Sequence, residues 1–257
     1  MNDALRISGL SVTLSGRRIL SDIALTVRPR ELVVVIGPNG SGKTTLLRAA
    51  TGLVPSEGAI EVGGASLPTM PLAERARRIA YLPQGHIFYW PLPVADVVAL
   101  GRLPRGAGAD LSEADRLAVE RALAETGTTE YARRAVTTLS GGEKARVAIA
   151  RVLATEAPLL LADEPTASLD PRYQLATVAL LRRHAEAGGA VVAVLHDLAL
   201  AARSADRIVV LDGGRIVADG PPRAVLTPER LAETFGVTAE ILEVRGMPVV
   251  VPLSART

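Results

Sequence analysis

A glycine-rich run that contains a lysine and two threonines, Gly37–Thr45, has the residue types needed to hold phosphate groups. Its first eight residues fit the pattern G-x-x-x-x-G-K-[ST] at every specified position. Glycines let the main chain come close to a triphosphate, so that successive N–H groups and the start of the next helix cradle it. Lys43 would supply a charge to the β- and γ-phosphates, and the Thr44 hydroxyl a ligand for Mg²⁺. The predicted phosphate site consists of Gly37, Pro38, Asn39, Gly40, Ser41, Gly42, Lys43, Thr44 and Thr45.

Two consecutive carboxylates, Asp163-Glu164, follow the apolar run Leu159–Ala162, and Pro165 ends the strand that this run predicts. At the carboxyl end of a strand beside the phosphate loop, Asp163 would reach Mg²⁺. Its neighbour Glu164 points elsewhere, and it is placed to orient or deprotonate the water that attacks a phosphate. Without the glycine-rich loop, the same pair would be interpreted as a solvated strand end.

A second glycine-containing helix start, Leu139-Ser140-Gly141-Gly142-Glu143, precedes an amphipathic stretch that predicts a helix from about 140 to 153. Ser140 and Glu143 form a capping box, which is an ordinary way to begin a helix. Two glycines in the first turn destabilise a helix, however, and close approach of an anion to its positive end explains them better. Ser140, Gly141 and Gly142 are therefore predicted to form a second phosphate-binding helix start.

The order of the apolar runs predicts an α/β core into which a helical segment is inserted. Alternating apolar residues over 5–27 predict antiparallel strands. Between about 85 and 150, prolines mark loops, and Ser112 is the expected N-cap of an amphipathic helix. Three continuous apolar runs predict buried strands, at Leu32–Ile36, Leu159–Ala162 and Ala190–Leu195.

Composition and charge exclude several kinds of site. The chain of 257 residues has no cysteine, which rules out disulfides, thiolate zinc sites and iron–sulfur clusters, and it has only three histidines. A formal net charge of +2 gives no basic footprint, so no nucleic-acid partner is predicted. No apolar run reaches the roughly 20 residues of a spanning helix, and the N-terminus is unlike a signal peptide. We therefore expect a cytosolic protein that reaches a membrane only through a partner.

The sequence resembles the ATP-binding subunits of ABC transporters over nearly its whole length, because six motifs of that family occur here in the usual order. These motifs are the Walker A loop Gly37–Thr45, the Q-loop residue Gln84, the signature Leu139–Glu143, the Walker B pair Asp163-Glu164, the D-loop Ser168-Leu169-Asp170 and the H-loop residue His196. The resemblance implies an α/β fold, a P-loop NTPase core with an antiparallel β subdomain and an inserted helical subdomain. It implies one ABC ATPase domain over 1–240, with the helical subdomain at about 85–150, and a C-terminal tail over 241–257.

The resemblance also implies a mechanism fuelled by ATP. Two subunits would form a head-to-tail homodimer, in which the signature helix of one covers the γ-phosphate held by the P-loop of the other. Glu164, His196 and Gln84 are the implied catalytic residues, with Gln84 at the metal and the attacking water and His196 at the γ-phosphate. Thr44, Gln84 and Asp163 are the implied ligands of Mg²⁺. Hydrolysis would remove the bridging phosphate and open the dimer.

Weaker features within the resemblance favour one group of importers. Pro93–Arg102, Val194–Leu198 and the stretch near Thr227-Pro228-Glu229 are similar to ATPase subunits that import iron–siderophore complexes, haem or cobalamin. Such a subunit would lie on the cytoplasmic face of the inner membrane, bound to integral-membrane permease subunits. The permease would receive cargo from a periplasmic or extracellular substrate-binding protein, and Gly85–Pro93 is the implied groove for the permease.

The sequence departs from the family pattern in two places. The position that often carries an adenine-stacking aromatic residue in the family is Leu14 here, and Lys144-Ala145-Arg146 replaces a glutamine- and arginine-rich run.

A GTPase is disfavoured, because guanine recognition needs an Asn-Lys-x-Asp motif and the only asparagines are Asn2 and Asn39. The alternatives are a soluble ABC-type ATPase that is not coupled to transport, an importer of another substrate class, and a nucleotide-binding module without turnover.

Overall fold

Strand β3 lies inside a six-stranded sheet, and all five of its residues are buried. The computed structural model describes residues 2–85, 87–108, 110–167, 169–244 and 246–255. The elements within them follow one another in this order, with η denoting 3₁₀ helices: β1 Leu5–Leu14, β2 Arg17–Val27, β3 Leu32–Ile36, α1 Lys43–Ala50, β4 Glu57–Val62, β5 Ala65–Ser66, α2 Leu72–Arg78, β6 Ile79–Leu82, α3 Val94–Ala99, η1 Leu100–Arg105, α4 Glu113–Glu125, η2 Thr129–Tyr131, η3 Val136–Thr138, α5 Gly141–Leu153, β7 Leu159–Asp163, α6 Pro171–Glu186, β8 Ala190–Val194, α7 Leu198–Ser204, β9 Arg207–Asp212, β10 Arg215–Gly220, α8 Pro222–Val225, α9 Pro228–Phe235, β11 Val237–Val244 and β12 Met247–Ala255.

The place of β3 in the sheet explains why it is apolar throughout. The strand order is β10-β9-β3-β8-β7-β6, and β3 runs parallel to both of its neighbours. Val33 and Val35 belong to a core shared with α1 and a small antiparallel sheet. Leu32, Val34 and Ile36 belong to a second core, shared with α5, α6 and α7. Because both faces of the strand are covered, only apolar side chains fit, as the continuous run predicted.

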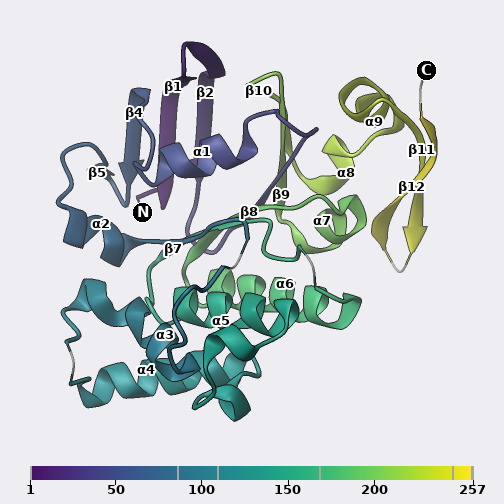
Figure 1. The fold of residues 1–257 in the computed structure, drawn as a ribbon. Coiled ribbons are helices and arrows are strands. Elements are labelled where there is room, and N and C mark those ends of the chain that lie inside the picture. Colours follow the sequence, from purple (N-terminus) through teal and green to yellow (C-terminus); the bar gives the residue numbers. More distant parts are fainter. Residues whose placement is uncertain (1, 86, 109, 168, 245, 256–257) are drawn as a thin grey trace.

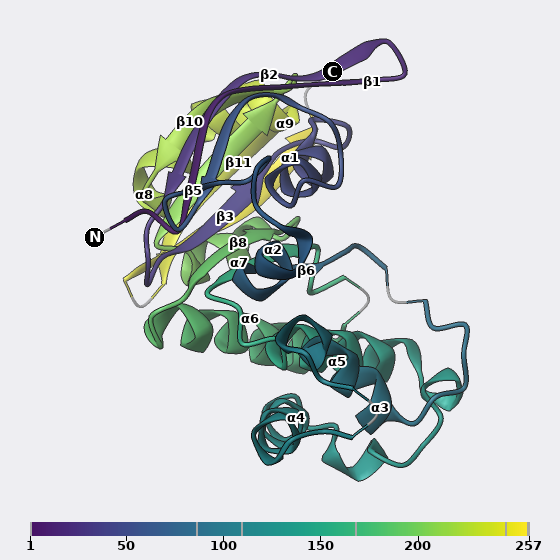
Figure 2. The same cartoon turned by 90° about the vertical axis from the view of Figure 1, so that its left-hand side faces the viewer.

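A four-stranded antiparallel sheet with the order β2-β1-β4-β5 covers the α1 side of the molecule (Figure 2). Its central strand β1 pairs antiparallel with β2 and with β4. Its inward residues, among them Leu5 and Ile7, are almost completely buried. The alternating pattern over 5–27 therefore predicted these strands correctly, since one face of such a sheet meets the core and the other meets solvent.

A helical lobe built from α3, α4 and α5 lies apart from the antiparallel sheet, at the lower end of the view in Figure 1. It enters the chain between β6 and β7, as an insertion into the central sheet. The three helices enclose a core of their own, to which Val97, Leu123 and Val147 contribute. The predicted cap is confirmed, because the Ser112 hydroxyl accepts a hydrogen bond from the Asp115 amide at 3.2 Å.

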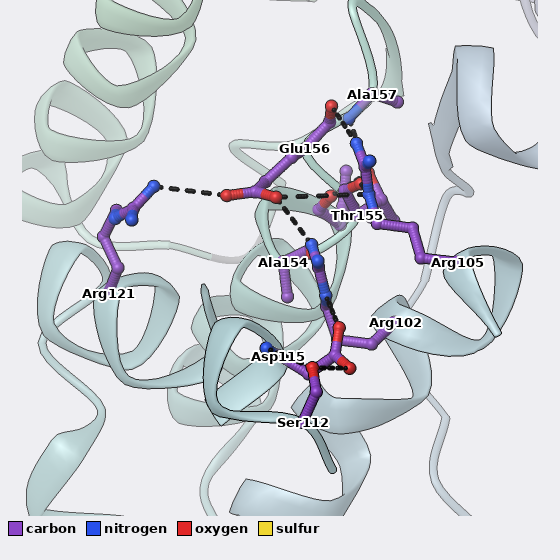
Figure 3. Close-up of polar contacts among 10 residues, drawn as sticks. Arg102, Arg105, Ser112, Asp115, Arg121, Ala154, Thr155, Glu156 and Ala157 are labelled. Atoms are coloured by element: carbon purple, nitrogen blue, oxygen red, sulfur yellow. Dashed lines mark hydrogen bonds and ion pairs between the residues drawn. The ribbon is translucent and has the colours of Figure 1, made fainter. Parts of the chain in front are cut away.

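A buried arginine ties three segments of the helical lobe together (Figure 3). The Nε atom of Arg102 donates to Asp115 at 2.8 Å, and its Nη1 atom donates to Glu156 at 2.8 Å and to the carbonyl of Ala154 at 2.7 Å. Arg121 reaches the other oxygen of Glu156 at 3.2 Å from a more exposed position. The cluster fixes the ends of α4 and α5 against η1.

Strands β11 and β12 form a hairpin over most of the stretch predicted to be a C-terminal tail. Strands β11 and β12 pair antiparallel from Val244↔Met247 outward, and they pack against α7 and α9. The boundary expected between residues 240 and 241 therefore falls inside β11, and the division into a domain and a tail stays a prediction. Over the ranges that the structure describes, no helix has both the length and the apolar character needed to cross a lipid bilayer.

Candidate nucleotide-binding site

Four strands of the central sheet carry the predicted phosphate and metal residues at their carboxyl ends. Gly37 follows β3, Gln84 comes shortly after β6, Asp163 ends β7, and His196 comes shortly after β8. These strands run parallel to their neighbours in the order β3-β8-β7-β6, so their carboxyl ends meet at one edge. Ligand sites of open α/β sheets lie at this edge. The topology thereby gathers residues that are far apart in the sequence.

The loop between β3 and α1 follows a path that requires glycine at two positions. Gly37 has φ 156°, and a Cβ atom there would lie 2.0 Å from the carbonyl oxygen of Leu211. Gly42 is the N-cap of α1 with φ 105°, and its Cβ atom would lie 2.6 Å from Leu20. Among the described residues, no side chain caps α1. Its first amides are therefore open to an anion at the positive end of the helix dipole.

The side chain of Lys43 folds back over this loop. Its Nζ atom donates to the carbonyl oxygens of Gly37 and Pro38, both at 2.9 Å, and the residue is almost completely buried. Burial lowers the pKa of this ammonium, while the nearby carboxylates of Glu164 and Asp163 act in the opposite direction. Among the described residues, the hydrogen-bond acceptors of this buried cation are carbonyl groups, so it is well suited to bind a group of higher negative charge.

Asp163, the carboxylate predicted to bind the metal, is completely buried at the end of β7. Within that structure, neither of its carboxylate oxygens has a hydrogen-bond partner. Burial raises the pKa of this carboxyl group; the nearby Thr44 hydroxyl acts in the opposite direction, although it does not meet hydrogen-bond geometry, and the charge of Glu164 adds to the increase. A buried carboxylate without partners is unfavourable, so a divalent cation beside it would remove a large desolvation penalty. The donor set of Asp163 and the Thr44 hydroxyl consists of oxygen atoms and fits Mg²⁺.

Glu164 and His196 are brought together from two strand ends. Glu164 Oε1 lies 2.5 Å from Nε2 of His196, and the Glu164 side chain is much less exposed than the imidazole. Glu164 has φ 52°, in the left-handed region that non-glycine residues seldom adopt. The backbone therefore turns sharply between Asp163 and Glu164, so that the two carboxylates serve different positions, as the sequence predicted.

A cavity of about 910 Å³ is bordered by Lys43 and Glu164, whereas the buried Asp163 is not among its lining residues. Gln84, Glu164 and His196 share it with the phosphate loop. Its lining residues are Arg17, Arg18, Ile19, Asn39, Gly40, Gly42, Lys43, Thr44, Thr45, Gln84, Glu164, His196, Gly213 and Gly214. The structure thus places most of the predicted loop and all three predicted catalytic residues around one space.

Five of the lining residues were missed from the sequence, and they come from two turns. Arg17, Arg18 and Ile19 begin β2, and Gly213 and Gly214 join β9 to β10. A Cβ atom at Gly214 would lie 2.2 Å from the carbonyl oxygen of Ile19, so glycine lets the two turns touch.

The expected adenine position is not part of this lining. Leu14 packs partly buried against the core near α1, and Arg17 is its cross-strand partner in the β1–β2 pair. The turn at Ser15-Gly16 carries the chain back, so that the start of β2 and not the end of β1 borders the cavity. Leu14, the position that often carries an adenine-stacking aromatic residue in the family, is therefore not among the residues that border the cavity.

The signature residues lie elsewhere on the same chain. Ser140 caps α5 in a capping box, with Glu143 Oε2 accepting from the Ser140 amide at 2.8 Å and Ser140 Oγ accepting from the Glu143 amide at 3.4 Å. Ser140 and Gly141 are exposed, and no signature residue lines the cavity. A Cβ atom at Gly141 would meet nothing within 4 Å in the described structure. The fold of one chain therefore gives no packing reason for this glycine.

The predicted D-loop is described only in part. Ser168 lies outside the described residues, Leu169 is buried, and Asp170 caps α6 by accepting a hydrogen bond from the Tyr173 amide at 3.1 Å. Asp197, beside His196, caps α7 in the same way through the Leu200 amide at 2.9 Å. Both aspartates have a local structural role, which the sequence reading did not assign.

Comparisons with known proteins agree with this arrangement. A family model described as "ABC transporter" matches residues 20–167. The hemin import ATP-binding protein HmuV of Streptomyces coelicolor is 47% identical over 234 residues, and the match covers 91% of this chain and 83% of that protein. The cobalamin import ATP-binding protein BtuD of Halobacterium salinarum is 44% identical over 257 residues, covering 98% of this chain and 64% of that protein.

A solved structure gives the same answer for the fold. An inward-facing transporter assigned to the metal-chelate type has a TM-score of 0.84 at 27% identity, and the match covers 99% of this chain and 98% of that one. The predicted fold class, a P-loop core with an antiparallel β subdomain and a helical insertion, is thereby confirmed. With a family model that fits more than half of its length and close relatives along nearly all of it, the chain belongs to the ABC transporter family as one of its ATP-binding proteins.

Proposed function

We propose that the chain is the ATP-hydrolysing subunit of an importer for haem, another iron chelate or cobalamin. The observation that carries the proposal is the single cavity shared by Lys43, Gln84, Glu164 and His196. It combines a phosphate-binding cation with two groups that can take part in proton transfer. This combination supports hydrolysis rather than binding alone.

Nucleotide binding would exchange the partners of Lys43. Its ammonium group donates to the carbonyls of Gly37 and Pro38, and phosphate oxygens of higher charge compete for the same hydrogen atoms. The open amides at the start of α1 hold the phosphates from the other side. Ile19 and the arginines at the start of β2 border the same cavity, where the nucleoside would lie.

Magnesium would bind at Thr44 and Asp163, with Gln84 beside them. The two buried Asp163 oxygens without partners support this assignment. When bound, the metal neutralises charge on the phosphate oxygens and so favours nucleophilic attack. Glu164 would orient and deprotonate the attacking water, and His196 would hold the Glu164 carboxylate in place and contact the γ-phosphate. The short Glu164–His196 hydrogen bond supports a joint role for these residues.

A homodimer would complete the site. Ser140, Gly141 and Gly142 lie outside the cavity of their own chain, and Gly141 has open space around it. A partner's ATP in that space would explain the cost of glycine in a first turn, roughly 1 kcal/mol relative to alanine. We therefore place the signature of each protomer over the phosphates bound by the other.

The permease would dock on the segment after Gln84, within the predicted groove Gly85–Pro93. Tyr89 and Trp90 are 81% and 74% exposed, which is unusual for aromatic side chains of this size. Ile87 is exposed beside them. This apolar surface supports a membrane-bound partner, so the subunit would lie at the cytoplasmic face of the cell membrane. A substrate-binding protein outside the membrane would deliver the cargo to the permease.

The substrate class follows from the relatives, whose names give hemin and cobalamin as cargo, and from the metal-chelate type of the structural neighbour.

The test of ATP hydrolysis uses the chain co-expressed with a candidate permease. Phosphate release should be rapid in the wild type and at least about 100-fold slower in Lys43→Ala, because the charge at the phosphates is lost. Equal rates in the two proteins would refute the phosphate site.

A double variant, Tyr89→Ser with Trp90→Ser, separates transport from an uncoupled ATPase. Loss of co-purification with the permease, at unchanged circular dichroism, is the expected result. Equal recovery of the permease would favour a docking surface elsewhere. Uptake into proteoliposomes of hemin, a ferric siderophore and cobalamin in parallel would then identify the cargo.

A further inference from the structure

An arginine of the signature helix binds the end of another helix. Arg146 lies in the second turn of α5 and is only 8% exposed. Its Nη1 atom donates to the carbonyl oxygens of Gly127 at 2.8 Å and Thr126 at 3.4 Å. Thr126 is the C-cap of α4, so the guanidinium group lies at the negative end of that helix dipole. The interaction ties α5 to α4 within the helical lobe.

The same guanidinium group contacts two tyrosine rings from different parts of the fold. Its central carbon lies 4.3 Å from the ring centroid of Tyr173 and 5.7 Å from that of Tyr131. Tyr131 ends η2 in the helical lobe, whereas Tyr173 lies in the first turn of α6, which packs on the central sheet. A desolvated guanidinium this close to a ring face is strongly attracted to it. Arg146 therefore joins the helical lobe to the start of α6.

The start of α6 is in turn fixed to the strand end that carries Glu164. The Tyr173 amide donates to Asp170, and Gln174 Nε2 donates to the carbonyl of Thr166 at 3.4 Å. The carbonyl of Glu164 accepts from the Ala167 amide at 3.1 Å. These bonds connect the backbone of Glu164, which carries the proposed catalytic carboxylate, to the first turn of α6, which carries the Tyr173 ring.

The start of α5 also comes near the side chain of Leu169, just before α6. A Cβ atom at Gly142 would lie 3.7 Å from Leu169, which is in van der Waals contact range. The two helix starts, one with Ser140 and one with Asp170, are thus close together, and the Arg146–Tyr173 stack joins them. Neither Arg146 nor Tyr173 lines the nucleotide cavity.

We infer that Arg146 and Tyr173 are positioning residues that fix the spacing between Glu164, which serves the protomer's own ATP, and Ser140, which serves the partner's ATP. The inference rests on the proposed homodimer. In such a dimer each protomer contributes to both sites, and the two sites close together only if this spacing is kept. Losing the stack would leave nucleotide binding by a single chain intact and would weaken closure of the pair.

The test is made in the full-length Glu164→Gln protein, which is expected to bind ATP without turning it over. Sedimentation velocity gives the Mg·ATP concentration for half-maximal dimerisation, and calorimetry gives Mg·ADP affinity of the monomer. Tyr173→Leu and Arg146→Lys should each raise the Mg·ATP concentration for half-maximal dimerisation about tenfold. The first loses the ring of the stack and the second loses the planar cation. Mg·ADP affinity should stay within about twofold of the parent, as no cavity residue changes.

Two variants serve as matched controls. Tyr173→Phe keeps the ring, and Arg172→Lys makes the same arginine change on an exposed guanidinium 5.7 Å from the same ring. Both should dimerise at the ATP concentration of the parent, within about twofold. If Tyr173 acted through its hydroxyl group, Tyr173→Phe would instead dimerise as poorly as Tyr173→Leu.

Three outcomes would count against the inference. Dimerisation of both Tyr173→Leu and Arg146→Lys at the parent's ATP concentration would overturn it. The inference would also be overturned if Tyr173→Leu and Arg146→Lys lowered the Mg·ADP affinity and the melting temperature along with dimerisation. The stack would then only stabilise the fold. If the Glu164→Gln parent itself stays monomeric at saturating Mg·ATP, the proposed homodimer fails, and the inference fails with it.

Discussion

The Oε1 atom of Glu164 lies 2.5 Å from Nε2 of His196, so two residues with separate implied roles form one hydrogen-bonded pair. Glu164 is held from both sides, by a left-handed backbone at φ 52° and by the imidazole. A non-glycine residue in that conformation costs of order 1 kcal/mol, and such strain concentrates at functional sites. The direction of this carboxylate is therefore determined by the fold and not by Glu164 alone.

The pair predicts non-additive effects on ATP hydrolysis. Glu164→Gln should lower kcat by about 10³-fold, because proton transfer from water is lost. His196→Ala should lower it less, and the double variant should match Glu164→Gln, since His196 acts partly through the same carboxylate. Phosphate release at saturating Mg·ATP measures all four proteins of the cycle. Independent roles would instead multiply the two losses, and that result would contradict the pairing.

Asp163 should make the metal-free protein less stable at neutral pH than an asparagine variant. Burial raises the pKa of its carboxyl group above the ordinary 3.8, so the folded protein holds this proton more tightly than the unfolded chain. Stability from this group is thus full below pH 3.8, and it falls as pH rises through the folded pKa. Thermal melts of Asp163→Asn in EDTA should show a higher Tm at pH 7 and a flatter pH dependence. A lower Tm than wild type would show that the carboxylate has a stabilising partner.

Mg·ATP should reverse this order of stability. Ligand at about 100 times its Kd adds about 2.7 kcal/mol to the free energy of unfolding. Wild type should gain this amount with Mg·ATP, whereas Asp163→Asn should gain much less, because one metal ligand is missing. Melts with ATP in EDTA provide the control without metal. An equal Mg²⁺-dependent gain in both proteins would exclude Asp163 as a ligand.

Nucleoside binding should depend on Ile19 and not on Leu14. Ile19 lines the cavity, whereas Leu14 packs toward the core. Ile19→Ala should weaken ATP binding by roughly fivefold, about 1 kcal/mol, because apolar contact area is lost. Leu14→Tyr, which would help if position 14 stacked on adenine, should leave the affinity within about twofold. Titration calorimetry measures these affinities. If Leu14→Tyr bound ATP more tightly than the wild type, the adenine would lie at the end of β1 instead.

Two arginines that share Glu156 should differ greatly in their effect on stability. Arg102 is buried and also binds Asp115 and a carbonyl, whereas Arg121 reaches Glu156 from an exposed position (Figure 3). Removing one partner from a buried ion pair is strongly destabilising, so Arg102→Met should cost roughly 3 kcal/mol. Arg121→Met should stay within about 0.5 kcal/mol, as exposed pairs contribute little. Urea unfolding measures both, and similar values for the two variants would show that the cluster does not act as a buried pair.

The phosphate loop and the buried strands were readable from the sequence because their determinants are local. A phosphate cradle needs consecutive backbone amides followed by a helix, so Gly37–Thr45 contains almost all of it. A strand covered on both faces needs a continuous apolar run, as at Leu32–Ile36. The resemblance to ABC ATPases added residues such as Gln84 and His196, which no local pattern would have singled out.

Several features of the site depend on strand pairing, and the sequence did not reveal them. The turn at Ser15-Gly16 brings Ile19 to the cavity and removes Leu14 from it. Gly214 borders the cavity because the turn between β9 and β10 lies beside the start of β2, a contact between segments nearly 200 residues apart. Pairing register and packing between distant segments carry no local signal in a single sequence.

By itself, therefore, the sequence determined the local devices of this protein: the glycine-rich cradle, the capping box at Ser140 and the two carboxylates at Asp163-Glu164. Only the tertiary structure decided how they are combined. It joined Glu164 to His196 across 32 positions, left Asp163 buried without a partner among the described residues, and stacked Arg146 on Tyr173 between two lobes. The physical reason is that burial, orientation and charge pairing belong to the packed chain, whereas a helix start or a strand is specified by its neighbours in sequence.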